Sequence, residues 1–352
     1  MRQFFLDLSA DGLRMPIGSD LLLHAHDDPN DIVRDGARLG AVLKETAERF
    51  RTPLGVSRMN LELEKSVLLQ MLGVPAAEVD KFHFPSAPSD EELAAVDERF
   101  DPDLDPRLRA HIDSIAWIAA NSDLLPVGMS IGPFSLMTKL LADPIMPIYS
   151  AGMGITAAED PDVAMLERVL EIATRFVLKS LEQQIEAGAK AVLIADPAAN
   201  KVFISPKQMA AGSNVFERLP IAAMRRVKAL LDAHDVDLIF HCCGELTDSM
   251  LTAFTTLRPV MISLGSSRVL WEDAAIVPKD IVLYGNLPSK SFYSDDLISR
   301  AEVEARACTL IAKMREANHP FILGSECDIL SVPGCEETLL AKADLLASCA
   351  CG

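Results

Sequence analysis

The strongest constraint on the fold is an alternation of short apolar runs with longer amphipathic stretches, which starts near residue 120. The apolar runs lack the period-two pattern of a half-exposed strand, as expected for parallel strands that are covered on both faces. Between them lie stretches with helical periodicity, such as 160–190 and 294–319. The predicted strands are 124–132, 190–197, 236–244, 260–265, 280–286 and 320–326.

This alternation predicts a parallel α/β fold. Six strands in the last two-thirds of the chain, with one or two earlier, favour a (β/α)8 TIM-type barrel over an open sheet. No GxGxxG motif follows the first clear strand, which argues against a dinucleotide-binding fold. The first part of the chain is less regular, with amphipathic helices at 28–50 and 60–74. We expect residues 1–110 to form an N-terminal helical cap on a barrel of residues 111–352, together one structural domain.

Composition limits the partners and the compartment. The chain has 33 basic and 51 acidic residues, so its formal charge is 33 − 51 = −18, which argues against binding to nucleic acid or to an anionic membrane. It has no signal-peptide pattern and no apolar run of about 18 residues, the length of a membrane span. Seven irregularly spaced cysteines predict free thiols and a cytoplasmic location, with Cys349 and Cys351 exposed in a frayed tail.

A candidate metal site ends two of the predicted strands. His241 and Cys243 are two residues apart at the end of one strand, so their side chains share a face, while Cys242 points to the other face. Cys327 ends the strand that we place last in the barrel. The C-terminal ends of barrel strands meet at one mouth, and an imidazole with two thiolates suits Zn²⁺ with an open fourth position. Alternatively, the cysteines are buried small hydrophobes and the histidine only satisfies a backbone group.

Several stretches resemble the uroporphyrinogen decarboxylase superfamily. The pattern His-x-Cys with a distant single Cys is similar to the zinc pattern of its corrinoid methyltransferase branch, the methylcobamide:coenzyme M methyltransferase-like proteins. Five further stretches resemble superfamily segments in the same order. They are "SRMNLELEKSVLLQMLG" (57–73), "PVGMSIGPFSLMTKLL" (126–141), "EAGAKAVLIADPAANKVFISPKQM" (186–209), "VLYGNLPS" (282–289) and "PFILGSECDI" (320–329).

The resemblance implies a chemistry. It implies Zn²⁺ on His241, Cys243 and Cys327, and transfer of a methyl group between a corrinoid carried by a partner protein, as methylcobalamin or cob(I)alamin, and a small substrate. Zinc would deprotonate a substrate thiol, or polarise the leaving heteroatom of a methylated substrate, so both directions of transfer stay open.

Four other residues are candidates for the pocket. Asp196 ends a predicted strand, and the resemblance implies that it lines the pocket or acts in catalysis; a loop or helix cap is the alternative. Asn286 also ends a strand, as part of either the pocket or a turn. Glu245 and Glu326 flank the proposed ligands, and we expect them to contribute to substrate or cofactor binding or to remain surface carboxylates.

Two other activities fit the same barrel. A metal-free decarboxylase would carry an arginine motif resembling "MRQAGR" near its N-terminus, whereas this chain reads "RTPLGVSRMN" at 51–60. A metal-dependent hydrolase would use the His-x-His of His24 and His26, with Asp328 as a further ligand. That pattern also needs histidines at the ends of two middle strands, and among the remaining histidines only His241 ends a predicted strand.

Overall fold

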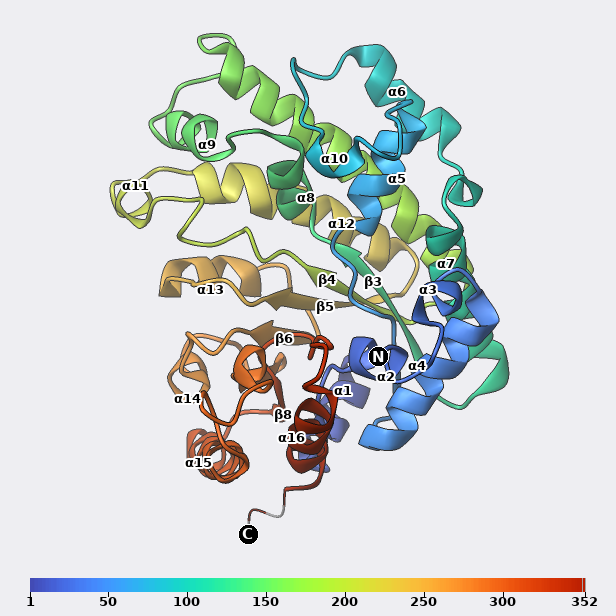
Figure 1. The fold of residues 1–352 in the computed structure, drawn as a ribbon. Helices are drawn as coiled ribbons and strands as arrows, with labels where there is room; N and C mark the ends of the chain where they lie inside the picture. The colour runs from blue at the N-terminus through green and yellow to red at the C-terminus, as the bar shows by residue number, and fades with distance from the viewer. Residues whose placement is uncertain (350, 352) are drawn as a thin grey trace.

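The computed structural model describes residues 1–349 and residue 351. Eight parallel strands curl into a barrel that is surrounded by helices, which confirms the predicted (β/α)8 TIM-type fold (Figure 1). All six predicted strands are present, within a few residues of their expected bounds. The strands are β1 (Arg14–Met15), β2 (Leu54–Val56), β3 (Leu125–Ile131), β4 (Ala191–Ala195), β5 (Asp237–Cys242), β6 (Met261–Leu264), β7 (Val282–Leu287) and β8 (Phe321–Ser325).

The order of the strands follows the chain, and the last strand pairs with the first. Strands β2 to β8 lie side by side in sequence order, and β1 pairs with β8 with Arg14 opposite Leu323. Strands β1 and β2 form the two ends of the sheet. The C-terminal ends of the strands therefore gather at one end of the barrel, which we call the mouth.

Helices cover the outside of the strands. In Figure 1, α10 and α12 lie along β3 to β5, and α15 and α16 lie near β6 and β8. The helices are α1 (Arg2–Ala10), α2 (Ser19–Leu23), α3 (Pro29–Ile32), α4 (Gly36–Phe50), α5 (Leu63–Met71), α6 (Asp90–Arg99), α7 (Pro106–Asn121), α8 (Pro133–Leu140), α9 (Ile145–Gly152), α10 (Pro161–Glu186), α11 (Pro206–Ala210), α12 (Ala222–Ala233), α13 (Asp248–Thr255), α14 (Leu270–Asp273), α15 (Arg300–Ala317) and α16 (Glu336–Ser348).

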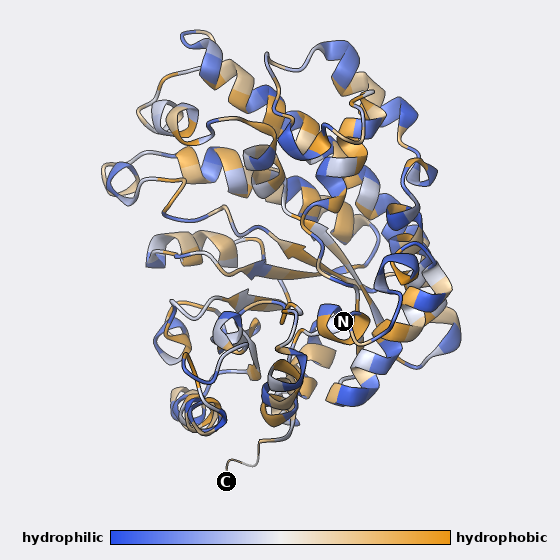
Figure 2. Ribbon diagram, in the orientation of Figure 1, coloured by the Kyte–Doolittle hydropathy of each residue, from blue (hydrophilic) through white to orange (hydrophobic). Residues whose placement is uncertain are grey.

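Local sequence explains where the two longest helices begin. The carboxylate of Asp160 accepts the first free N–H groups of α10, and Pro161 occupies its first position. Ser299 and Glu302 form a capping box at the start of α15. The long covering helices alternate apolar and hydrophilic residues along their length (Figure 2). None of the helices in residues 1–349 combines the length and apolar character that crossing a membrane requires.

The core has two parts. A large cluster lies between the strands and the helices, and a smaller one fills the inside of the barrel with residues such as Met129, Leu193 and Ile239. All five residues of β4 are buried, since they face one cluster or the other. Burial on both faces explains why the strands read as continuous apolar runs rather than as alternating ones.

The first 110 residues supply strands as well as helices. Strands β1 and β2 come from this part of the chain, together with α1 to α6. Helix α7 (Pro106–Asn121) runs across the expected boundary at residue 110. The division into a cap and a barrel therefore stays a prediction, with the addition that the cap region carries two of the eight strands.

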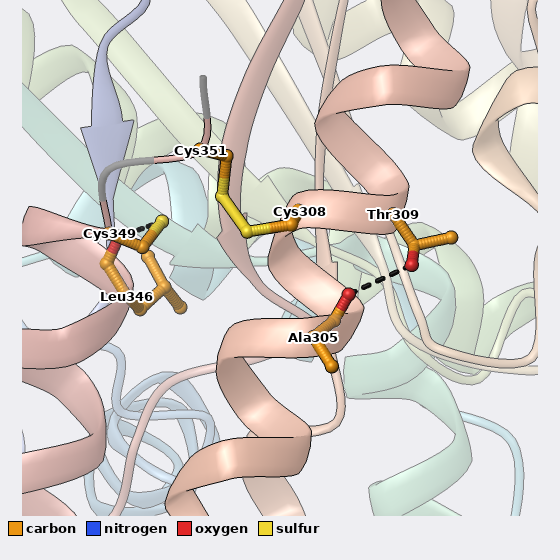
Figure 3. Close-up of a disulfide and its surroundings, with 6 residues drawn as sticks. All are labelled: Ala305, Cys308, Thr309, Leu346, Cys349 and Cys351. Atoms are coloured by element: carbon orange, nitrogen blue, oxygen red, sulfur yellow. Dashed lines mark hydrogen bonds between the residues drawn. A yellow bond between two sulfur atoms is a disulfide. The ribbon is translucent and has the colours of Figure 1, made fainter.

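The expectation of exposed thiols in the C-terminal tail is wrong. Cys351 forms a disulfide with Cys308 of α15, with the two Cα atoms 5.1 Å apart (Figure 3). Cys349 is buried, and its thiol donates to the carbonyl of Leu346. Helix α16 packs against α15, which brings the end of the chain beside Cys308. This contact is tertiary, so the irregular cysteine spacing gave no sign of it.

The floor of the barrel depends on a tight contact between β7 and β8. The ring of Tyr284 is fully buried, and its hydroxyl donates to the carbonyl of Met15 at 2.6 Å. A Cβ atom placed on Gly324 would lie 2.1 Å from this ring. Glycine at 324 is therefore what leaves space for the aromatic ring beneath the mouth.

We expect Gly324→Ala to lower the free energy of unfolding by about 1–3 kcal/mol, because the added methyl group overpacks the barrel interior. Urea denaturation measures this loss. In a double-mutant cycle with Tyr284→Leu, which removes the ring, the Gly324→Ala penalty should shrink. A penalty that is the same with and without the ring would contradict this explanation.

Candidate metal centre

Three soft donors converge at the mouth of the barrel. His241 lies near the end of β5, Cys243 follows this strand, and Cys327 lies two residues beyond β8. The donor atoms of the three side chains, one imidazole nitrogen and two sulfurs, all lie within 4.8 Å of one another. The structure thus brings together the three residues that the sequence singled out, although 84 residues separate the two cysteines.

The imidazole of His241 is buried and oriented. Its Nδ1 lies 2.8 Å from the hydroxyl of Ser263, the residue of β6 that pairs with His241 in the sheet. Its Nε2 is buried and has no hydrogen-bond partner among the described residues. In metal-ligating histidines, a hydrogen bond at one ring nitrogen commonly fixes the orientation of the ring and leaves the other nitrogen free to bind the metal. The unpartnered Nε2 therefore fits a ligand atom.

The two thiols of the centre are electrostatically linked. The hydrogen bond from the Cys327 thiol, with further help from His241, lowers the pKa of Cys243, and the same contact raises the pKa of Cys327. Of the two thiols, Cys243 is therefore the one that ionises more readily. Cys242 points away into the outer core, where burial raises the pKa of its thiol. One nitrogen and two sulfurs are a donor set that suits Zn²⁺.

Glu326 lies beside the centre and is fully engaged in hydrogen bonds. One carboxylate oxygen accepts from the backbone N–H and the hydroxyl of Ser266, at 3.1 and 2.7 Å. The other accepts from the N–H of Lys290 at 3.4 Å. Glu326 is only 5% exposed. It is thus a buried carboxylate next to Cys327, while its role toward a substrate stays a prediction.

Glu245 and Asn286 have other contacts. The carboxylate of Glu245 is exposed and pairs with Lys201. The side-chain amide of Asn286 donates to the carbonyls of Gly265 and Arg268, at 2.8 and 2.9 Å, and so braces the loop after β6. Asn286 also lines a cavity of about 400 Å³ between this loop and α15. The predicted binding roles of both residues remain untested by these contacts.

Asp196 is buried where β4 ends. Its Oδ1 accepts from the backbone N–H and the hydroxyl of Ser135, at 2.7 and 2.5 Å, and its Oδ2 has no partner among the described residues. Its own N–H donates to the carbonyl of His241. Burial raises the pKa of Asp196 to about 6. A carboxyl group in this state is poised to exchange a proton near neutral pH, which fits the predicted catalytic role without establishing it.

The residues of the hydrolase alternative are not assembled. His24 bonds to the backbone of Asp20 and His26 to the carboxylate of Glu45, and both imidazoles are well exposed. Asp328 is buried without a hydrogen-bond partner, and burial raises its pKa to about 7. Among the residues that the structure describes, only the group of His241 forms a cluster that could hold a metal.

Three residues of the centre escaped the sequence analysis. Ser263 could have been found, because it follows from the register of two adjacent strands. Ser266 and Lys290 lie on loops after β6 and β7, and both contact Glu326. Loop residues have no periodicity, so no sequence signal pointed to them.

We expect the pH dependence of stability to reveal the buried state of Asp196. In the folded protein, the carboxyl group of Asp196 keeps its proton up to about pH 6, whereas in the unfolded chain it has the ordinary pKa of 3.8. The contribution of Asp196 to the free energy of unfolding therefore falls as the pH rises from 3.8 to about 6. The Asp196→Asn variant has no carboxyl group at this position and does not show this fall. The free energy of unfolding of the variant, relative to that of wild type, should therefore rise with pH over the same interval and then level off.

Chemical denaturation at several pH values measures this difference. Asp296→Asn, which changes an exposed carboxylate, is the matched control and should show no such trend. A difference for Asp196→Asn that does not vary with pH would contradict the buried, protonated carboxyl.

Comparison with known proteins places this geometry in a family. No protein of curated function matches the sequence significantly. Among solved structures, the chain is similar to a methyltransferase from Methanosarcina mazei, with a TM-score of 0.66 and 15% identity over 97% of each chain. At this identity the likeness shows a shared fold. The family model for uroporphyrinogen decarboxylase (URO-D) matches residues 64–336, a range that contains all three donors. The chain therefore belongs to the uroporphyrinogen decarboxylase (URO-D) family.

Proposed function

We propose that this protein is a zinc-dependent methyltransferase that moves a methyl group between a corrinoid on a partner protein and a small thiol, or another methylated or methyl-accepting substrate. The observation that carries the proposal is the convergence of an imidazole nitrogen of His241 with the sulfurs of Cys243 and Cys327. A buried ring nitrogen without a partner is costly unless a ligand occupies it. The fold shared with a methyltransferase supports the same conclusion.

Each residue of the centre would have a distinct role. His241, Cys243 and Cys327 would hold the ion, and the contact of Nδ1 with Ser263 orients the imidazole and leaves Nε2 available as the ligand atom. A zinc ion held there would act as a Lewis acid that lowers the pKa of a substrate thiol or polarises a leaving heteroatom. Cys243 and Cys327 are partly exposed, so a substrate can reach this side of the centre from the mouth.

The methyl transfer itself requires the corrinoid as a second substrate. In the direction of thiol methylation, the sulfur gains the methyl group, the thiol proton leaves to solvent, and cobalt keeps the electron pair of the broken bond. A protein with a net charge of −18 would favour a corrinoid protein with a basic docking face. A cytoplasmic location is part of the same proposal, because the thiols of the centre must stay reduced to hold a metal; the disulfide between Cys308 and Cys351 is uncommon in such a compartment and argues in the other direction.

We expect purified, reduced wild-type protein to contain about one zinc ion per chain. His241→Ala, Cys243→Ser and Cys327→Ser should each lose most of it, because each removes one of three protein ligands. Cys242→Ala is the matched control, since this thiol faces the outer core, and should keep its zinc. Elemental analysis of the folded variants measures this. Wild-type protein without zinc would instead favour the metal-free decarboxylase.

We expect methyl transfer to depend on the metal. With methylcobalamin and a small thiol, the corrinoid absorption should change as the methyl group leaves cobalt. Chelation should abolish this change, and added Zn²⁺ should restore it, because the substrate thiol stays protonated near neutral pH without the ion. Equal rates before and after complete removal of the metal would refute a role for zinc.

A further inference from the structure

A cavity of about 500 Å³ lies at the end of the barrel opposite the metal centre. Arg14 and Phe321, the first residues of β1 and β8, line it together with residues of α1 and α15. The donors of the metal centre lie instead at the C-terminal ends of β5 and β8. The cavity is therefore a separate place in the fold, and the proposed function does not use it.

The walls of the cavity are mostly apolar. The apolar side chains come from α1, α15, β8 and the chain between α1 and β1, and they are Leu6, Leu13, Ile311, Met314, Phe321 and Leu323. Binding sites for small molecules commonly enclose about 300–1,000 Å³ and combine such walls with a few polar groups. This cavity has the size and the lining to hold the hydrocarbon part of a small molecule.

The charge of the lining is opposite to that of the whole chain. The chain has 33 basic and 51 acidic residues. The charged side chains on the walls are nevertheless Arg14 and Arg315, and no aspartate or glutamate is among the described residues that line the cavity. Positive charge beside apolar walls favours a ligand that carries a negative charge.

Arg14 has no counter-ion within the described part of the chain. The next residue, Met15, packs inside the barrel, so the side chain of Arg14 points to the opposite face of β1, toward the helices. Arg14 is partly buried, and it forms no hydrogen bond or ion pair with the residues that the structure describes. A carboxylate can accept two N–H groups of such a guanidinium side by side.

A second polar group of the lining also lacks a partner. His319 is 6% exposed, and its Nε2 lies 3.0 Å from the carbonyl of Ile281, which can only accept a hydrogen bond. Nε2 therefore carries the proton of the neutral ring, and no described residue donates to the buried Nδ1. Buried polar atoms are rarely left without a partner. Two polar side chains of one cavity, Arg14 and His319, thus have unused hydrogen-bonding capacity.

We propose that this cavity is a binding site for a small amphipathic carboxylate. The hydrocarbon chain of the ligand lies against the apolar walls, and its carboxylate pairs with the guanidinium of Arg14. A molecule bound there contacts α1, β1, β8 and α15 at once, so it stabilises the folded chain. The site is independent of the metal, because none of the three proposed ligands lines it.

The test is calorimetric titration of the full-length protein with octanoate and with two probes that each lack one part of it. The probe 1-octanol lacks the charge, and acetate lacks the chain. We expect about one octanoate per chain, with a Kd of about 100 μM or below, and no measurable binding of acetate in the same range. Arg14→Gln should weaken octanoate binding about tenfold and change 1-octanol binding by less than about twofold, because only the hydrogen bonds to the charged group are lost.

Two further variants control for the fold and for charge in general. Arg14→Lys keeps the positive charge and should retain most of the octanoate affinity. Arg34→Gln, which changes an exposed arginine outside the cavity, should leave every titration unchanged. Wild-type protein that does not bind octanoate, or that binds acetate equally well, would overturn the proposal. Octanoate binding that Arg14→Gln leaves unchanged, or weakens no more than 1-octanol binding, would overturn the pairing with Arg14.

Discussion

The curl of the parallel sheet is the constraint on which the candidate centre depends. His241 and Cys327 belong to β5 and β8, which are three strands apart in the sheet. In a flat sheet, three steps of about 4.8 Å would separate the two strand ends by about 14 Å. Their donor atoms instead lie within 4.8 Å. The curvature of the sheet, which the pairing of β1 with β8 stabilises at one side, therefore brings the three donors together without help from a ligand.

The packing inside the barrel explains why polar chemistry is confined to the mouth. The layers of side chains below the mouth are apolar, and the hydroxyl of Tyr284 donates its hydrogen bond to the backbone of β1. The next polar residues along β5 and β6 are His241 and Ser263, which satisfy each other only in part. One buried nitrogen stays without a partner, at a cost of about 1–3 kcal/mol in the absence of a ligand. The fold thus tolerates a local loss of stability at the position where a metal would restore it.

The sequence predicted the parts of this arrangement that follow from periodicity. Continuous apolar runs marked six strands, and the two-residue repeat placed His241 and Cys243 on one face. Strand β1 has only two residues and exists because β8 pairs with it, so no local pattern announces it. The disulfide of Cys308 links residues 43 positions apart through a tertiary contact. The backbone N–H of Lys290 contacts Glu326 because its turn packs against the end of β8, and this contact likewise depends on long-range packing.

The fold and the family leave the chemistry open, since one barrel supports many reactions, and the decision lies with the side chains at the mouth. A substrate rich in carboxylates would need cations there. Instead the mouth presents the buried carboxyls of Asp196 and Asp328, whose pKa values burial raises to about 6 and about 7, together with two thiols. Arg58 is already paired with Asp20. Partial burial lowers the pKa of Lys290, but the negative charge of Cys243 and Glu326 raises it overall. These side chains favour chemistry at a soft heteroatom over recognition of a polycarboxylate.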